Sequence, residues 1–215
     1  MADSLKLPAL YVEGESDLHT IIHLVGRHAI KLDKEIGPVI IKKAKGDRAV
    51  LASMRTATRA STLRPVGFVI DADKPVHQRW QSVCEHLKDL GLTLPAEAPS
   101  DGFIGDSSQT LSRVGVWIMP DNRTDEGRLE DMLQTLVPAG DGLIQLAKSS
   151  TGEAIKAGSG FVSQDRQKAE LHCWLAWQQE PGLSFGTALK THFFRHDSNV
   201  ATAFVAWFKR LYDLT

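Results

Sequence analysis

The stretch Val-Gly-Phe-Val-Ile-Asp-Ala-Asp, from Val66 to Asp73, decides the fold class of this chain. Its first five residues form an apolar run rich in β-branched side chains, which is typical of a strand buried on both faces of a parallel sheet. Asp71 and Asp73 follow at the carboxyl end of that strand, where ligands and chemistry collect in such sheets. Two acids this close repel each other unless a proton or a cation compensates their charge, and Mg²⁺ prefers oxygen ligands. The alternative is that Asp73 caps a helix that begins near Pro75.

Working outward from this stretch, the chain alternates strand patterns with helix patterns. Each short apolar run is followed by a segment in which apolar residues recur at helical spacing. This alternation predicts an α/β fold with a mainly parallel sheet flanked by helices. The predicted strands are 7–12, 38–41, 66–70 and 114–119, and the predicted helices are about 16–29, 47–60, 76–90 and 129–137.

The last third of the chain differs from the part before it. Strand signals cease from Ala139 onward, and five glycines between positions 140 and 160 predict a loose, mobile connection. Two helices, at about 163–179 and 199–214, then close the chain, and the second carries an aromatic stripe that is typical of a buried core. We therefore expect an α/β core over residues 1–138 and a helical extension, packed on that core, over residues 139–215.

Composition limits the classes of partner. The formal net charge of the 215 residues is −1, so a nucleic acid would have to be bound by local basic patches rather than by a general positive field. The two cysteines, Cys84 and Cys173, are far apart and offer neither a disulfide framework nor a zinc motif. The sequence shows no signal-peptide core and no apolar run of membrane-spanning length. We expect a cytoplasmic protein without a membrane partner.

A basic segment follows the second predicted strand. Four of its side chains, Lys42, Lys43, Lys45 and Arg48, come directly after the carboxyl end of that strand. Such a position lies beside the proposed acids, so these side chains are candidates for contact with nucleic-acid phosphates. The alternative is that they form an ordinary solvated face.

The spacing of the acids resembles a known family signature. A glutamate after the first strand, in Leu-Tyr-Val-Glu-Gly-Glu-Ser-Asp (10–17), and Asp-x-Asp after the third resemble the Toprim domain. Toprim domains form the catalytic fold of type IA and type II topoisomerases, bacterial primases and the nucleases of the OLD family. The runs 115–122 and 129–131 are similar to a group of small stand-alone Toprim-like proteins of unassigned function. The resemblance covers roughly the first 135 residues and implies a Toprim-like, that is Rossmann-like, sheet.

The resemblance also implies roles for individual residues. Glu13 would be a metal ligand or a general base, and Asp71 and Asp73 would hold a divalent metal, Mg²⁺ or Mn²⁺. A metal near the scissile phosphate stabilises charge on the attacking or leaving oxygen, while a carboxylate positions the nucleophile.

Nucleases of the OLD family add two further elements. A further acid supports a second metal, and a lysine helps to neutralise the phosphate. In this chain Glu130 and Asp131 are candidates for the further acid and metal ligand, and Lys168 is the candidate for a catalytic lysine.

These implications define the expected activity. We expect a Mg²⁺-dependent phosphodiesterase, a nuclease acting on DNA or RNA, and the resemblance adds an ATPase as an expected partner protein. The alternative is a non-enzymatic Toprim-like module that binds nucleic acid or a partner ATPase. Near-neutral charge favours the module, whereas the intact trio of acids favours the enzyme. Tyr11 in a strand and Tyr212 in the final helix have no domain around them that suits a topoisomerase nucleophile.

Overall fold

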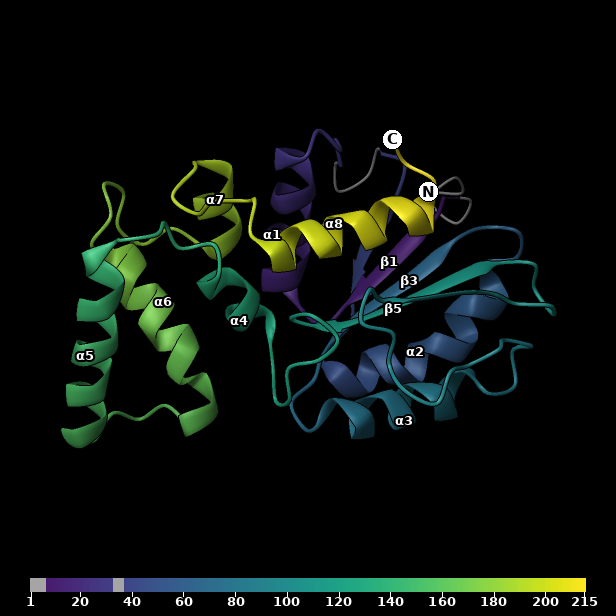
Figure 1. Ribbon diagram of the computed structural model, residues 1–215, viewed down its shortest axis with the longest axis horizontal. Helices are drawn as coiled ribbons and strands as arrows, with labels where there is room; N and C mark the ends of the chain where they lie inside the picture. Colours follow the sequence, from purple (N-terminus) through teal and green to yellow (C-terminus); the bar gives the residue numbers. More distant parts are fainter. Residues whose placement is uncertain (1–6, 33–36) are drawn as a thin grey trace.

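The computed structural model describes residues 7–32 and 37–215, and within them five strands form one sheet in the order β2-β1-β3-β5-β4. Neighbouring strands run parallel except for β4, which pairs antiparallel with β5 at one edge. The mainly parallel, Rossmann-like sheet predicted from the sequence is therefore confirmed (Figure 1). The strands are β1 (Ala9–Val12), β2 (Ile40–Lys43), β3 (Val66–Asp71), β4 (Phe103–Asp106) and β5 (Arg113–Met119).

Helices cover both faces of this sheet. Helices α2 and α3 share one buried apolar cluster with β3 and β5, while α1 and α8 belong to a second cluster on the opposite face. The helices of the described residues, including one 3₁₀ turn (η1), are α1 (Glu15–Arg27), α2 (Asp47–Ala60), α3 (Val76–Leu87), α4 (Leu129–Gln134), α5 (Gly142–Lys156), η1 (Ser163–Asp165), α6 (Arg166–Ala176), α7 (Phe185–Lys190) and α8 (Asn199–Tyr212).

Strand β3 lies between β1 and β5, with its apolar side chains buried on both faces. Phe68 packs with the α2 and α3 cluster, whereas Val69 packs with the opposite one. Gly67 gives α8 its close approach, because a Cβ at this position would lie 2.6 Å from the Tyr212 hydroxyl and 2.8 Å from Leu211. The Tyr212 hydroxyl in turn donates a hydrogen bond of 2.8 Å to the carbonyl of Ala9 in β1. The final helix is thus fixed to the middle of the sheet.

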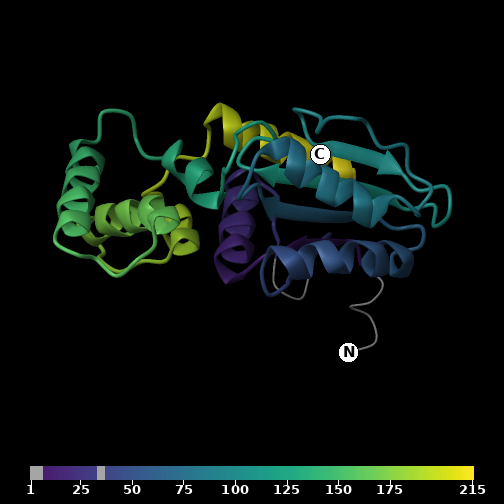
Figure 2. The same cartoon turned by 90° about the horizontal axis from the view of Figure 1, so that it is seen from below.

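Helices α5 and α6 stand to one side of the sheet in both views (Figures 1 and 2). They pack against each other, and α6 also contacts α4. The chain then returns through α7, where Gly186 lies against His19 of α1, and ends with α8 on the sheet. Among residues 7–32 and 37–215, no helix is both long and apolar enough to cross a membrane.

The prediction of a loose, mobile connection between residues 140 and 160 is wrong. Gly142 and Gly152 lie inside helix α5. Asp141 stabilises the start of this helix, since one of its carboxylate oxygens accepts the Leu143 N–H at 2.8 Å and the other accepts the Trp174 indole N–H at 2.9 Å. Contacts with α6 therefore overrule the low helix propensity of glycine.

Candidate metal centre

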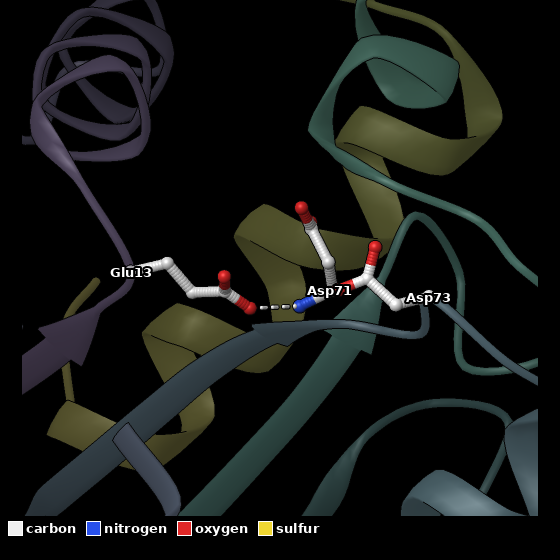
Figure 3. Close-up of side chains that lie close together, drawn as sticks. All are labelled: Glu13, Asp71 and Asp73. Carbon is white, nitrogen blue, oxygen red and sulfur yellow. Dashed lines mark hydrogen bonds between the residues drawn. The ribbon is translucent and has the colours of Figure 1, made fainter. Parts of the chain in front are cut away.

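Three carboxylates meet at the carboxyl edge of the sheet. Glu13 follows β1, Asp71 ends β3, and Asp73 lies two residues further on. Because β1 and β3 are parallel neighbours, their ends bring these side chains together, as predicted (Figure 3). Each residue presents one carboxylate oxygen, and these oxygens all lie within 4.8 Å of one another. Such a group could hold a metal ion, and carboxylate oxygens are ligands that Mg²⁺ and Mn²⁺ take in proteins.

Glu13 is held in place by the neighbouring strand. Its Oε1 accepts the backbone N–H of Asp71 at 2.8 Å, as Figure 3 shows. Burial raises the pKa of Glu13 to about 7, and the nearby charges of Asp17 and Asp73 add to the rise, while the hydrogen bond opposes it. Near neutral pH this side chain is therefore poised to exchange a proton or to gain a cation.

Asp71 lies in the middle of the group. Its Oδ1 accepts the backbone N–H of Leu129 at 3.0 Å. Burial, followed by the charges of Glu13, Asp17 and Glu130, raises the pKa of Asp71 well above its ordinary value. The centre thus concentrates more negative charge than its surroundings stabilise, which favours either a shared proton or a bound cation.

Asp73 does not cap helix α3, so that alternative is wrong. The residue has a left-handed backbone, with φ of 51°, and its Oδ1 lies 2.7 Å from Nη2 of Arg128. Its Oδ2 lies 3.4 Å from Nη2 of Arg79. The α3 cap is instead supplied by Asp125, whose Oδ1 accepts the Val76 N–H at 2.7 Å.

The loop between β5 and α4 holds the Asp-Ala-Asp turn in place. The carbonyl of Gly127 accepts the Ala72 N–H at 2.8 Å, next to the hydrogen bond that the Leu129 N–H donates to Asp71. A side chain at Gly127 would be obstructed, because its Cβ would lie 2.3 Å from Cδ of Pro120. This loop therefore positions the acids without contributing a ligand of its own.

Glu13 and Asp71 open into a cleft of about 370 Å³. Lys168 of α6, Arg128 and Glu130 line it together with Glu13 and Asp71. Burial raises the pKa of Glu130, while the charges of Lys168 and Arg128 oppose this rise. The structure thus brings the predicted Glu130 and Lys168 to the site, although Lys168 comes from the helices that stand beside the sheet.

Asp131 has a different environment from the one expected of a metal ligand. Its Oδ2 accepts the backbone N–H of Arg128 at 2.8 Å, as the capping residue of α4. Its Oδ1 accepts a hydrogen bond of 2.6 Å from Nε2 of Gln167. Both oxygens are therefore used to fix α4 and α6, and Asp131 is a structural residue beside the centre.

The basic segment begins next to the cleft. Gly46 lines the cleft, and its N–H donates to the Glu13 carbonyl at 3.1 Å. Lys43 forms an ion pair with Glu15, and Lys42 lies 5.5 Å from the centre of the Tyr11 ring. Two further basic side chains, Lys45 and Arg48, are exposed. Phosphate contact by this segment stays a prediction.

Asp17 and Arg128 belong to the site but were not predicted. Asp17 lines the cleft and accepts the Gly14 N–H at 3.0 Å, and burial raises its pKa to about 6. Asp17 is three residues after the N-cap Gly14, the spacing of the acidic half of a capping box, but Gly14 has no side chain to complete the motif and make it readable in the sequence. Arg128 has no signal in the sequence, because its pairing with Asp73 depends on the path of the β5–α4 loop.

Comparison with known proteins identifies a family but no activity. A family model described as "Protein of unknown function (DUF3226)" matches residues 8–213. Neither the curated proteins nor the solved structures gave a match. Since the family model covers nearly the whole chain, including the carboxylates and the helices beside the sheet, the chain belongs to the DUF3226 family.

Proposed function

We propose that this protein is a divalent-cation-dependent phosphodiesterase that cleaves DNA or RNA. The observation that carries the proposal is the convergence of Glu13, Asp71 and Asp73 at one edge of the sheet, with carboxylate oxygens within 4.8 Å of one another. Two of these acids also have raised pKa values, which a bound cation would lower. A purely structural cluster would gain nothing from acids that repel one another beside an open cleft.

The three acids would hold Mg²⁺ or Mn²⁺, which stabilises the charge that develops on phosphate and on the attacking or leaving oxygen. Glu13, whose pKa is raised to about 7 in the protein without a cation, would act either as a ligand of this ion or as the general base that accepts a proton from the attacking water. Its hydrogen bond to the Asp71 N–H keeps the carboxylate oriented along the edge of the sheet.

Lys168 and the basic segment supply the positive charge that a phosphate backbone requires. Lys168 lines the same cleft as Glu13 and Asp71, so it can neutralise a phosphate placed over the acids. Lys42, Lys43, Lys45 and Arg48 extend from the neighbouring strand end and would contact adjacent phosphates. An ATPase partner rests only on the resemblance to nucleases of the OLD family.

A tyrosine nucleophile, as topoisomerases use, does not fit this geometry. The Tyr212 hydroxyl is buried beneath α8 and donates to the Ala9 carbonyl. The Tyr11 ring stacks on Phe68, with 5.5 Å between ring centres, on the face opposite α8. Water is therefore the proposed nucleophile.

We also propose that the protein is cytoplasmic. Cys84 and Cys173 are both free thiols, which is compatible with a reducing compartment.

One observation favours a second function, a binding module without catalysis. Asp73 is paired with both Arg128 and Arg79, so part of the negative charge is compensated without a metal. Such a module would bind nucleic acid or a partner ATPase at the same edge of the sheet and would leave the phosphodiester intact.

A cleavage assay distinguishes the two functions. Single- and double-stranded DNA and RNA would be incubated with Mg²⁺ or Mn²⁺, with and without an ATPase encoded beside the protein. We expect cleavage by the wild type, none by Asp71→Asn, and full activity of Asp89→Asn, which changes an exposed acid of the α3–β4 connection. Equal cleavage by Asp71→Asn and the wild type would contradict the catalytic assignment. Binding without cleavage under all conditions would support the module.

A further inference from the structure

Arg128 connects the carboxylate centre with the helices that stand beside the sheet. Its Nη2 lies 2.7 Å from Asp73 Oδ1, and its Nη1 lies 3.8 Å from Asp165 Oδ1 of the η1 turn. The side chain lines the 370 Å³ cleft that contains Glu13, and it also lines an adjoining cavity of about 170 Å³ that contains Asp73. Arg128 is thus the residue that lines both spaces.

The two arginines that bind Asp73 are held very differently. Arg79 is 3% exposed, and its Nε donates to the Ala72 carbonyl at 2.9 Å while its Nη1 binds Asp47 Oδ2 at 3.1 Å. Arg128 is 26% exposed, and within residues 7–32 and 37–215 its side chain is paired with the carboxylates of Asp73 and Asp165 alone. Arg79 is therefore a fixed part of the turn, whereas Arg128 has room to leave Asp73.

The negative charge of the cleft favours a bound cation, and such a cation would compete with Arg128 for Asp73. The negative charges of Glu13, Asp17 and Glu130, which line the same cleft, all act on Asp71. A divalent cation at the proposed centre would compete with the guanidinium for the Asp73 carboxylate, and the two positive charges would repel each other. A divalent cation held between the three carboxylates would therefore weaken the ion pair between Arg128 and Asp73.

We propose that Arg128 exchanges partners: it neutralises Asp73 in the protein alone and binds a substrate phosphate once a divalent cation occupies the carboxylates. This inference rests on the proposed function, since it requires the same metal site. A released guanidinium would enter the cleft lined by Lys168, where its planar fork matches two oxygens of a phosphodiester. Arg128 would thereby make substrate binding depend on metal loading, whereas Lys168 is available at all times.

The test measures binding without cleavage. Titration calorimetry gives the affinity for Mn²⁺ alone, and fluorescence anisotropy gives the affinity for an uncleaved single-stranded phosphorothioate oligonucleotide, with and without Mn²⁺. Arg128→Gln should bind Mn²⁺ about tenfold more tightly than the wild type, because a charged competitor is removed. Arg123→Gln is the matched control, since Arg123 is an exposed residue of the same loop, and it should bind Mn²⁺ as the wild type does.

Oligonucleotide affinities measured with and without Mn²⁺ distinguish the exchange of partners by Arg128 from a general effect of its positive charge. In Arg128→Gln the enhancement of oligonucleotide binding by Mn²⁺ should fall by about fivefold or more, with little change in the absence of Mn²⁺. Lys168→Gln should weaken binding equally in both conditions. Arg128→Lys keeps the charge but loses the fork, so it should bind Mn²⁺ nearly as the wild type does and show a reduced enhancement.

Two failures can be told apart. If the wild type binds Mn²⁺ and Glu13→Gln abolishes this binding, but Arg128→Gln leaves the affinity unchanged, the exchange is wrong and the metal site stands. An equal loss of oligonucleotide affinity with and without Mn²⁺ in Arg128→Gln would overturn the exchange as well. If the wild type binds no Mn²⁺, or Glu13→Gln binds it normally, the proposed function and the exchange both fail.

Discussion

At the scale of single residues, the centre is a set of charges that the fold destabilises. The pKa of Glu13 is raised from 4.5 to about 7, chiefly by burial, so the folded state binds the proton more tightly than the unfolded chain does. The contribution of Glu13 to stability is therefore greatest at low pH, is lost as the pH rises from about 4.5 to about 7, and stays lost above that. A bound cation would reverse this loss.

Replacement of Glu13 by glutamine tests this charge balance. Glutamine keeps an acceptor for the Asp71 N–H but carries no charge, so Glu13→Gln should raise the free energy of unfolding by about 1–3 kcal/mol at pH 8 in metal-free buffer. The gain should shrink as the pH falls below about 7 and disappear well below pH 4.5, where the wild-type side chain is protonated in both states. Thermal or urea unfolding across this pH range measures it.

Glu15 is the matched control for Glu13. It is exposed two residues away, and its ion pair with Lys43 lowers its pKa instead of raising it. Glu15→Gln should therefore show no stabilisation at pH 8. If both variants respond alike, or if Glu13→Gln is destabilised at pH 8, the raised pKa of Glu13 is not a property of the folded protein.

At the scale of elements, the β5–α4 loop is the support of the centre. Gly127→Ala would force a Cβ to within 2.3 Å of Pro120 and displace the carbonyl that binds the Ala72 N–H. We expect a loss of about 1–3 kcal/mol in the free energy of unfolding, together with weaker Mn²⁺ binding. Chemical denaturation and calorimetry measure the two effects.

Gly152 provides the control for this substitution. It lies inside α5, and a Cβ there would have no heavy atom within 4 Å. Gly152→Ala should stabilise the protein by about 0.5–1 kcal/mol and leave Mn²⁺ binding unchanged. Wild-type metal affinity in Gly127→Ala would show that the loop does not position the acids.

The cap of α3 allows structural and functional acids to be separated. Asp125→Ala removes the acceptor of the Val76 N–H and should cost about 1 kcal/mol of stability. Its Mn²⁺ affinity should stay within the range of the wild type, because Asp125 is not among the three converging acids. Asp73→Ala should instead weaken Mn²⁺ binding and cause little loss of stability in metal-free buffer. The same pattern in both variants would contradict the division of roles.

The elements that the sequence predicted are those with strong apolar patterns. Strands β1, β2, β3 and β5 and the helices that follow them have continuous apolar runs or clear helical stripes, so their order could be predicted. Strand β4 has only four residues, including Gly105, and its edge position is fixed by pairing with β5. Helix α5 buries only a narrow stripe of Ile144, Ala147 and Thr151. This weak pattern, together with the two glycines of the helix, is why the sequence did not predict it.

At the scale of the whole molecule, residues from both ends of the chain build one core. Trp207 of α8 is fully buried against Trp117 of β5, and its indole N–H donates to the Phe103 carbonyl at 3.1 Å. Trp207→Ala should lower the free energy of unfolding by about 3–5 kcal/mol. Trp177, which is 39% exposed after α6, is the control and should cost about 1 kcal/mol or less. Equal losses would contradict the placement of α8 in the core.

The arrangement of strands and loops in the whole molecule explains which residues of the site could be predicted from the sequence. Glu13, Asp71 and Asp73 were predictable because parallel neighbouring strands must end at the same edge. Arg128 was not, since its contact with Asp73 requires the β5–α4 loop to fold back over the turn after β3. The place of Lys168 was suggested only by resemblance, because it depends on how α6 packs against α4.

The central claim is that Glu13, Asp71 and Asp73 hold a divalent cation. Crystals soaked in Mn²⁺ and measured at its absorption edge test this claim most directly. We predict an anomalous peak between the three carboxylates, at about 2.1–2.2 Å from their oxygens, with Arg128 moved away from Asp73. Saturating Mn²⁺ with no peak at this position, and Asp73 still paired with Arg128, would contradict it.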